Sequence, residues 1–425
     1  MHLALIYYFL VWIFARIPVI KKSRFLRLVL ILVCLWFFSL LTGAPASVLR
    51  AAVMFTFIAI GSCFGKQNSI YNSLAISAFL LLCFDPYMLW DVGFQLSYLA
   101  VFGIVLCQKY IYNWFYFSNK ILNAGWKVAS VSLAAQVFTL PICIYYFHQF
   151  PFLFLLSNLI AIPLSTVALW GAVAVVAVSP FPFAALCLGK ALWFFLWLLN
   201  HSVLVINSIP FSLWKGLSIS PFETILLYFI FTALLYWLIK KNKQAFKIAL
   251  VFSSVFMVSR VYKSGESFHQ KKMVVYNISQ HSAIDLIDGN YSFFISDSAV
   301  LNDNLLMNYN VKPARTAFLV DNSFSSSPFI YHENKFYQFY NKRFLLIDSS
   351  IKYYRGAKKM KLDFIIISKN APVKISDIAS NFDCGNYIFD ASNSLWKIEK
   401  WKKECEELHL HSHSVSLQGA FVTDL

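Results

Sequence analysis

Apolar residues recur in runs of about 20 residues through the first 260 positions, the length that a helix needs to cross a bilayer. Polar loops separate these runs. The pattern predicts nine or ten membrane spans, the fourth being short: Leu3–Ile20, Phe25–Leu41, Ser47–Phe64, Ile70–Phe84, Val92–Tyr110, Trp126–Phe147, Phe152–Val178, Ala184–Ile209, Phe222–Ile239 and Ala245–Ser259. The seventh contains Pro163 and is too long for one straight helix, so we expect a kinked or discontinuous element there.

From Lys263 onward the pattern changes to short β-rich runs separated by polar turns. The runs MVVYNI, YSFFIS, RFLLID and LDFIIIS are typical of strands, and amphipathic helices are indicated at Val373–Ser380 and Leu395–Leu408. Strands that alternate with helices predict an α/β domain, and this stretch is long enough for a core of its own. We therefore expect two domains, a polytopic α-helical membrane domain over residues 1–260 and an α/β domain over 261–425.

Composition and charge agree with a multi-pass membrane protein. Hydrophobic residues make up 59% of the chain and charged residues 13%, against about 25% charged in soluble domains. Residues 1–259 hold 16 Lys and Arg against 3 acidic residues, whereas 260–425 hold 20 against 17. The basic residues concentrate in alternate loops, which places the N-terminus outside by the positive-inside rule. The tenth span would put the C-terminal domain on the outer face; without that span the domain is cytoplasmic.

The stretch DPYMLWDVGFQLS holds Asp85 and Asp91, two of the three acidic residues of the first 259 positions. A carboxylate at membrane depth is costly and normally faces a protein interior or a water-filled path. Beside Gly93 and Gln95, the two carboxylates indicate a polar, partly broken segment that lines a passage. The alternative is that both cap helix ends at the membrane surface. Both interpretations stay open at this point.

Four motifs give the chain a family resemblance. They are GAPASVLRAAVMF, DPYMLWDVGFQLSYLAVFGI, AAQVFTLPICIYYFHQFP and SNLIAIPL. The sequence resembles the ComEC-type competence proteins, which form the inner-membrane channel for single-stranded DNA during natural transformation. The resemblance implies single-stranded DNA as cargo, a cytoplasmic ATPase or helicase and an outer-face DNA receptor as partners, and residence in a bacterial cytoplasmic membrane. No GxxxxGK[ST] phosphate loop occurs, so a partner would supply the energy.

Within these motifs Arg50 is the one basic residue that points to a specific contact. Its guanidinium could guide phosphates by forked hydrogen bonds. The alternative, which we favour, is an ion pair with Asp85 or Asp91 that neutralises the buried charges. The candidate path-lining or motif residues are Arg50, Asp85, Asp91, Gly93, Gln95, Ser97, Gln136, Asn158 and Pro163. Asn158 and Pro163 suit helix packing and a kink equally well.

Residues 273–425 resemble the metallo-β-lactamase-like domain that often ends members of this family. Asp297 matches the acidic residue of its liDgG motif, but the metal motif S/T-H-x-H-x-D-H should follow the strand LDFIIIS. Its metal-binding places hold Lys369, Ala371, Val373 and Lys374, none of which coordinates zinc at neutral pH. We therefore predict a domain that lacks metal ligands, with no metal, no cofactor, no nuclease activity and no enzymatic role.

Two other features bear on metals and on function. The tail HLHSH places His409, His411 and His413 at alternate positions, for which ordinary surface histidines on a strand are favoured over a metal site. Eight cysteines are scattered singly, so neither a disulfide framework nor a zinc site is indicated.

The opening MHLALIY resembles the family's SGLHLALIY entered in the middle, with His2 on the family histidine. The resemblance therefore suggests a fragment or an internal start, because family members usually carry an OB-like domain before this point. The expected function is passage of single-stranded DNA across the membrane. The alternatives are a membrane-anchored nuclease, a transporter of other anionic polymers or lipids, and an inactive fragment. Whether the chain forms a homo-oligomer stays open.

Overall fold

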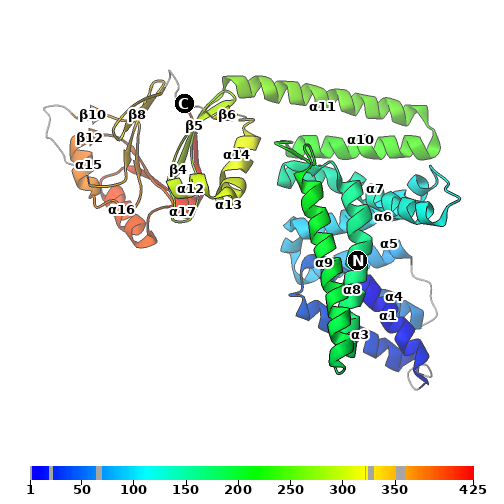
Figure 1. Cartoon of the computed structure of the whole chain (residues 1–425). Helices are drawn as coiled ribbons and strands as arrows, with labels where there is room; N and C mark the ends of the chain where they lie inside the picture. Colours follow the sequence, from blue (N-terminus) through cyan, green and yellow to red (C-terminus); the bar gives the residue numbers. More distant parts are fainter. Residues whose placement is uncertain (1, 19–22, 64–68, 321, 324–329, 351–358) are drawn as a thin grey trace. The chain divides into compact units, whose positions relative to one another are not determined.

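The computed structural model describes residues 2–18, 23–63, 69–320, 322–323, 330–350 and 359–425. The chain divides into two compact units, Met1–Ser253 and Ser254–Leu425. The first is helical, and the second is built on two β-sheets (Figure 1). The boundary falls within α11, seven residues before the predicted one.

The first unit consists of helices joined by short connections. They are α1 (His2–Arg16), α3 (Arg24–Leu41), α4 (Ala46–Cys63), α5 (Ile70–Phe84), the 3₁₀-helix η1 (Pro86–Trp90), α6 (Val92–Tyr112), α7 (Lys120–Phe147), α8 (Phe154–Val178), α9 (Pro182–Ser208), α10 (Pro221–Lys240) and α11 (Lys243–His269). Two short strands pair antiparallel with each other: β1 (Gln149–Pro151), which follows α7, and β2 (Leu213–Lys215), which follows α9.

Each of the ten predicted apolar segments overlaps a helix, and seven helices of the described residues are long and apolar enough to cross a membrane. These seven are α3 and α6 to α11, whereas α1, α4 and α5 are shorter apolar helices. None of the residues in the apolar window of α9 is buried within the chain. Because so much apolar surface is unfavourable in water, α9 fits an apolar surrounding.

Two predicted details differ from the structure. The helix α8 runs without a break through Pro163, so the discontinuous alternative is wrong, while the kink stays a prediction. The Ser165 and Thr166 hydroxyls both donate to the Ile162 carbonyl, at 3.0 and 2.8 Å. The last segment does not end at Ser259, because α11 continues to His269. Hydropathy reports where apolar residues stop, and a helix can continue with polar side chains beyond that point.

Helix α6 packs against α7 at a very close approach. A Cβ atom on Gly103 would lie 2.4 Å from the Ala134 carbonyl oxygen and 3.0 Å from the Phe138 ring. Only glycine allows the two backbones to come this near. Cys107 and Ile111 extend the same buried contact toward the end of α6.

Within the described residues, the second unit contains a five-stranded sheet, a six-stranded sheet and a two-stranded parallel pair, β10 (Met360–Lys361) with β12 (Phe382–Asp383). The first has the order β15-β3-β4-β5-β6, from Phe421–Asp424, Lys271–Val275, Ala283–Asp288, Tyr291–Ser296 and Asn322–Ser323. The second has the order β14-β13-β11-β9-β8-β7, from His411–Ser414, Asn386–Phe389, Phe364–Ile367, Lys342–Ile347, Phe336–Phe339 and Ile330–Glu333. Strands β9, β11, β13 and β14 are parallel, and β7, β8 and β9 form an antiparallel meander.

Buried side chains order this unit into four layers. Met273 and Leu286 of one sheet share a core with Phe344 and Ile366 of the other, so the sheets pack face to face. Helices α15 (Ile375–Asn381) and α16 (Leu395–Glu407) cover the outer face of the six-stranded sheet. The short helices α12 (Ser298–Asn302), α13 (Asn304–Leu306) and α14 (Lys312–Ala317) follow β5, and residues around them cover the outer face of the other sheet.

All four residues of β11 are buried, as expected for a parallel strand covered on both faces. Strands alternate with helices mainly from β9 onward, so the predicted α/β pattern describes chiefly the second sheet and its helices; in the first sheet only β5 and β6 are connected through helices, among the described residues. The first sheet is mainly antiparallel, with β6 as its parallel edge.

Candidate functional site

Arg50 lies in a polar cluster formed by α4, α5 and α6. Its Nη1 donates to the Ser97 carbonyl oxygen at 2.5 Å, and its guanidinium carbon lies 5.7 Å from the centre of the Tyr98 ring. The Tyr98 hydroxyl is 2.9 Å from the hydroxyl of buried Ser77. Among the described residues the buried Arg50 Nε has no hydrogen-bond partner. A buried donor of this kind calls for a water or a ligand, so Arg50 keeps hydrogen-bonding capacity that the described chain does not use.

The two carboxylates of the motif serve as helix caps. Asp85 Oδ1 accepts a hydrogen bond from the Tyr87 amide at 3.0 Å and begins η1. Asp91 Oδ1 accepts one from the Phe94 amide at 2.6 Å and begins α6. Asp91 is exposed, and Asp85 is half-buried. Of the two interpretations left open by the sequence, the geometry supports capping.

The favoured ion pair between Arg50 and one of these carboxylates is wrong. Neither Asp85 nor Asp91 forms an ion pair within the part of the chain that the structure describes, and both instead accept backbone N–H groups. Gly93 fits the same arrangement, because a Cβ atom there would lie 3.1 Å from Asp91 Oδ1. A larger residue would therefore crowd the capping carboxylate.

Gln95 and Ser97 bring further polar groups to this region. Gln95 Nε2 donates to the Leu89 carbonyl at 2.8 Å, which ties η1 to α6. Its Oε1 is buried and has no partner in the described chain. The Ser97 hydroxyl donates to the Phe94 carbonyl at 3.0 Å. The region thus contains one unused buried donor, Arg50 Nε, and one unused buried acceptor.

The remaining candidate residues lie on other helices. Gln136 is half-buried on α7, Asn158 is half-buried on α8, and Pro163 is exposed on α8. No hydrogen bond within the described ranges joins their side chains to Arg50. Sequence reasoning missed Tyr98 and Ser77, although Tyr98 directly follows Ser97 in the motif.

Glu223 is the third acidic residue of the helical unit, and it too caps a helix. It is fully buried, and its Oε2 accepts a hydrogen bond from the Ser220 amide at 2.7 Å while the Ser220 hydroxyl accepts from the Glu223 amide. This capping box begins α10. All three carboxylates of residues 1–253 therefore have a structural explanation.

In the second unit, polar residues gather where β5 and β11 end. Lys369 Nζ lies 2.7 Å from Asp297 Oδ1, and Asp297 Oδ2 accepts the Ser282 amide at 2.9 Å. His281 Nδ1 lies 3.9 Å from the same oxygen. Partial burial raises the pKa of Asp297, but hydrogen bonds from Lys369 and Ser282 outweigh it and hold the value below its usual range. The hydrogen bond to Asp297 raises the pKa of Lys369.

This geometry is unsuited to binding a metal ion through Lys369. A protonated ammonium cannot donate an electron pair to a metal ion. It also already pairs with the Asp297 carboxylate, the group that a metal cation would need. Ala371 is buried, Val373 is half-buried and Lys374 is exposed. Across the described ranges, no three His, Cys, Asp or Glu side chains come together as metal ligands.

The C-terminal histidines do not converge on one point. The strand β14 begins at His411, so His409 precedes it with a positive φ of 54°. His411 is exposed, whereas His413 Nε2 lies 3.1 Å from the Gly419 carbonyl oxygen. The predicted strand is present at the sheet edge, but it holds two of the three histidines.

Asp390, directly after β13, is fully buried and gives a pH prediction. It accepts hydrogen bonds from the Ser392 amide and hydroxyl, at 3.1 and 2.5 Å, and burial raises its pKa to about 6. Since the folded state then binds the proton more tightly than the unfolded state, this group makes stability fall as pH rises from about 4 to about 6.

Asp390→Asn removes this titration. We therefore expect the free energy of unfolding of the variant, minus that of the natural chain, to increase between pH 4 and pH 6 by up to about 3 kcal/mol. The change should level off near pH 7. Hydrogen exchange of β11 amides, compared between the two proteins at each pH, measures the difference. A constant difference from pH 4 to 7 would contradict the prediction.

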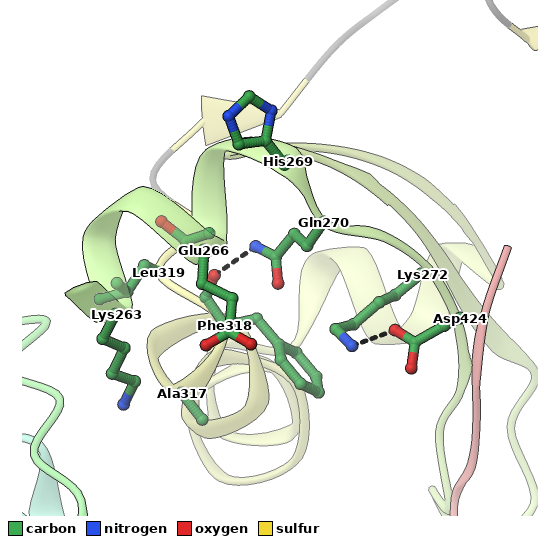
Figure 2. Close-up of a pocket in the computed structure, with 10 residues that line it drawn as sticks. Lys263, Glu266, His269, Gln270, Lys272, Ala317, Phe318, Leu319 and Asp424 are labelled. Carbon is green, nitrogen blue, oxygen red and sulfur yellow. Dashed lines mark hydrogen bonds and ion pairs between the residues drawn. The ribbon is translucent and has the colours of Figure 1, made fainter.

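A cavity of about 510 Å³ lies where α11 leads into β3 (Figure 2). Gln270 Nε2 donates to the Phe318 carbonyl at 2.6 Å, and Lys272 pairs with Asp424. The wall also includes Lys263 and Glu266 of α11. Two lysines therefore face two carboxylates, and such a balance does not favour a polyanion.

Comparisons with known proteins agree with the motifs. The competence protein family matches residues 1–241, and the ComEC C-terminal domain matches residues 273–425. The ComE operon protein 3 of Bacillus subtilis (strain 168) is 30% identical over 166 residues. That match covers 39% of this chain and 20% of the relative, so the shared part is a fifth of the relative's length. No solved structure matches the chain.

The helical unit, with its run of apolar helices and its motif cluster around Arg50, is the part that the first family describes. The chain belongs to the competence protein family, and the resemblance noted in the sequence is confirmed.

Proposed function

We propose that this chain takes part in DNA uptake during competence, as a multi-pass component of the bacterial cytoplasmic membrane. Within that role, its helical unit would pass a single DNA strand. The observation that carries the proposal is the Arg50 cluster, which lies inside the region matched by the competence protein family. The seven long apolar helices are consistent with the membrane setting.

A strand of DNA needs hydrogen-bonding groups along its path, because phosphates and base edges lose water when they enter the protein. Arg50 Nε and Gln95 Oε1 are buried groups of this kind that the described chain does not use. A guanidinium suits a phosphate through paired N–H groups, and an amide suits a base edge. Asp85 and Asp91 contribute by fixing the starts of η1 and α6, which position Gln95 and Ser97.

Energy would come from a cytoplasmic ATPase or helicase, and a DNA receptor on the outer face would deliver the strand. In this proposal the C-terminal unit carries out no hydrolysis and resembles a metallo-β-lactamase without its metal ligands. The ion pair between Lys369 and Asp297 supports this assignment.

Deletion of the gene from a naturally transformable host tests the proposal. We expect uptake of labelled linear DNA into the cytoplasm to fall to the background of a strain without competence, and the intact gene to restore it. DNA binding at the cell surface should remain, since the receptor is a different protein. Unchanged uptake in the deletion strain would refute the proposal, and metal-dependent DNA cleavage by the purified chain would refute the assignment of the C-terminal unit.

A further inference from the structure

The outer face of the meander β7-β8-β9 carries a row of three polar and aromatic side chains. Tyr331 lies directly opposite Gln338, and Gln338 lies directly opposite Arg343. Directly opposed residues on neighbouring antiparallel strands point to the same side of the sheet. Tyr331, Gln338 and Arg343 therefore form one row across three strands.

This face extends beyond the helices that cover the rest of the sheet. The core under α15 and α16 includes Leu345 of β9 and, at its margin, Phe336 of β8. Tyr331, one strand further out, is 64% exposed. A cavity of about 520 Å³ lies here, bordered also by Met360 and Leu362. That volume falls in the usual range for small-ligand sites, about 300–1,000 Å³, and suits one or two nucleotides.

The hydrogen bonds of this row leave the ring faces of Tyr331 and the Nη groups of Arg343 available to a ligand. The Tyr331 hydroxyl donates to Glu333 Oε2 at 3.1 Å, which engages the edge of the ring and leaves its faces open. Arg343 Nε donates to Gln338 Oε1 at 3.2 Å, and Gln338 Nε2 donates to the Tyr340 carbonyl at 3.0 Å. Within the described chain the terminal Nη groups of Arg343 have no hydrogen bond, so they can meet an anion.

Charge around the meander favours a polyanion. Residues 330–363 hold eight Lys and Arg against three acidic residues, whereas the rest of residues 260–425 holds 12 against 14. Three of the eight basic residues, at 352, 355 and 358, lie outside the described residues. The net positive charge of the C-terminal unit is therefore concentrated in the segment that contains the groove. The lining of the groove itself holds one basic residue, Arg343, and one acidic residue, Glu333, whose carboxylate accepts the Tyr331 hydroxyl. The excess of positive charge therefore lies in the segment around the groove.

We propose that this groove binds single-stranded nucleic acid, with a base stacked on Tyr331 and a phosphate bound by Arg343. A tyrosine face accepts any base, and a guanidinium binds phosphate through paired N–H groups, so the site would be tolerant of sequence. The identification of the strand as DNA rests on the proposed function in DNA uptake. The groove would hold the strand outside the helical unit.

The test measures binding of the full chain, in detergent micelles, to a fluorescent oligothymidylate of about 15 nucleotides by anisotropy. Tyr331→Ala is expected to weaken binding about tenfold, and Tyr331→Phe to retain it because the ring remains. Arg343→Gln should weaken binding and reduce the slope of log affinity against log salt by about 0.7. Matched controls are Tyr309→Ala and Lys400→Gln, two exposed residues of the same unit that should bind like the natural chain.

An abasic oligonucleotide of equal length separates stacking from charge. The natural chain should bind it about tenfold more weakly than oligothymidylate, while Tyr331→Ala should bind both equally. Unchanged binding by Tyr331→Ala and Arg343→Gln would overturn the groove assignment and leave DNA uptake untouched. A loss of uptake in the deletion strain together with failure of the natural chain to bind oligothymidylate would also overturn it.

Discussion

Replacing Arg315 with Met is expected to destabilise the C-terminal unit by on the order of 3–5 kcal/mol, enough to unfold much of it. Asp285 is fully buried in β4, and Arg315 of α14 binds it twice, Nε to Oδ2 at 2.7 Å and Nη2 to Oδ1 at 3.0 Å. The Tyr276 hydroxyl donates to Oδ2 at 3.0 Å. Without the guanidinium, Asp285 would be a buried charge with one neutral donor, which is strongly unfavourable. Urea unfolding, monitored by hydrogen exchange of the β4 amides, measures the loss of unfolding free energy.

Two further variants make this expectation specific. Arg315→Met combined with Asp285→Leu should recover most of the stability, because removal of both charges leaves no uncompensated group. Lys342→Met is the matched control: Lys342 pairs with Asp363 at 3.0 Å, but the two side chains are 42% and 32% exposed. An exposed pair contributes about 0–1 kcal/mol. Equal losses for Arg315→Met and Lys342→Met would contradict the assignment of Arg315 as a buried partner.

The local sequence pattern was sufficient to predict most strands and helices, but not which strands pair with each other. The runs YSFFIS and LDFIIIS became β5 and β11 because apolar, β-branched and aromatic residues favour strands. The pairing of β15 with β3 joins the end of the chain to the beginning of the unit. Such a contact depends on the packing of the whole sheet, and no local feature of Phe421–Asp424 encodes it.

Helix ends show a similar limit. The apolar run of the last predicted span stops at Ser259, yet α11 continues for ten residues with polar side chains and charge. Ser220 and Glu223, by contrast, stand at capping-box spacing, with Pro221 at the first helical position. This start could have been read from the sequence.

The candidate site was predicted as a set of residues but not as a set of contacts. Arg50 and Ser97 were both singled out, and the structure brings them together although 47 residues separate them. The favoured partners, Asp85 and Asp91, are instead used by the amides of Tyr87 and Phe94. A capping carboxylate is satisfied by groups two or three residues away, so local hydrogen bonding takes precedence over a distant charge. This is why charge pairing across helices was the weakest inference from sequence.

Replacing Arg50 with Gln is expected to lower DNA uptake at least about tenfold, while the protein remains in the membrane fraction. The substitution removes the charge that would meet a phosphate and the bond from Nη1 to Ser97, a charged hydrogen bond worth about 1.5–3 kcal/mol. Arg50→Lys should be intermediate, because an ammonium keeps the charge but lacks the fork that reaches two groups at once. Uptake of labelled DNA, normalised to the amount of protein in membranes, is the measurement. Lys190→Gln is the control, since it removes a charge from an exposed position on α9.

Asp91→Asn separates the two explanations of Arg50. Asparagine caps a helix about as well as aspartate, so the single variant should take up DNA nearly as well as the natural chain. Combined with Arg50→Gln it should give the same deficit as Arg50→Gln alone, because the two residues have no shared contact. Restoration of uptake in the double variant would mean that the carboxylate and the guanidinium neutralise each other in the working protein. The capping geometry would then describe a different state from the one that is active in DNA uptake.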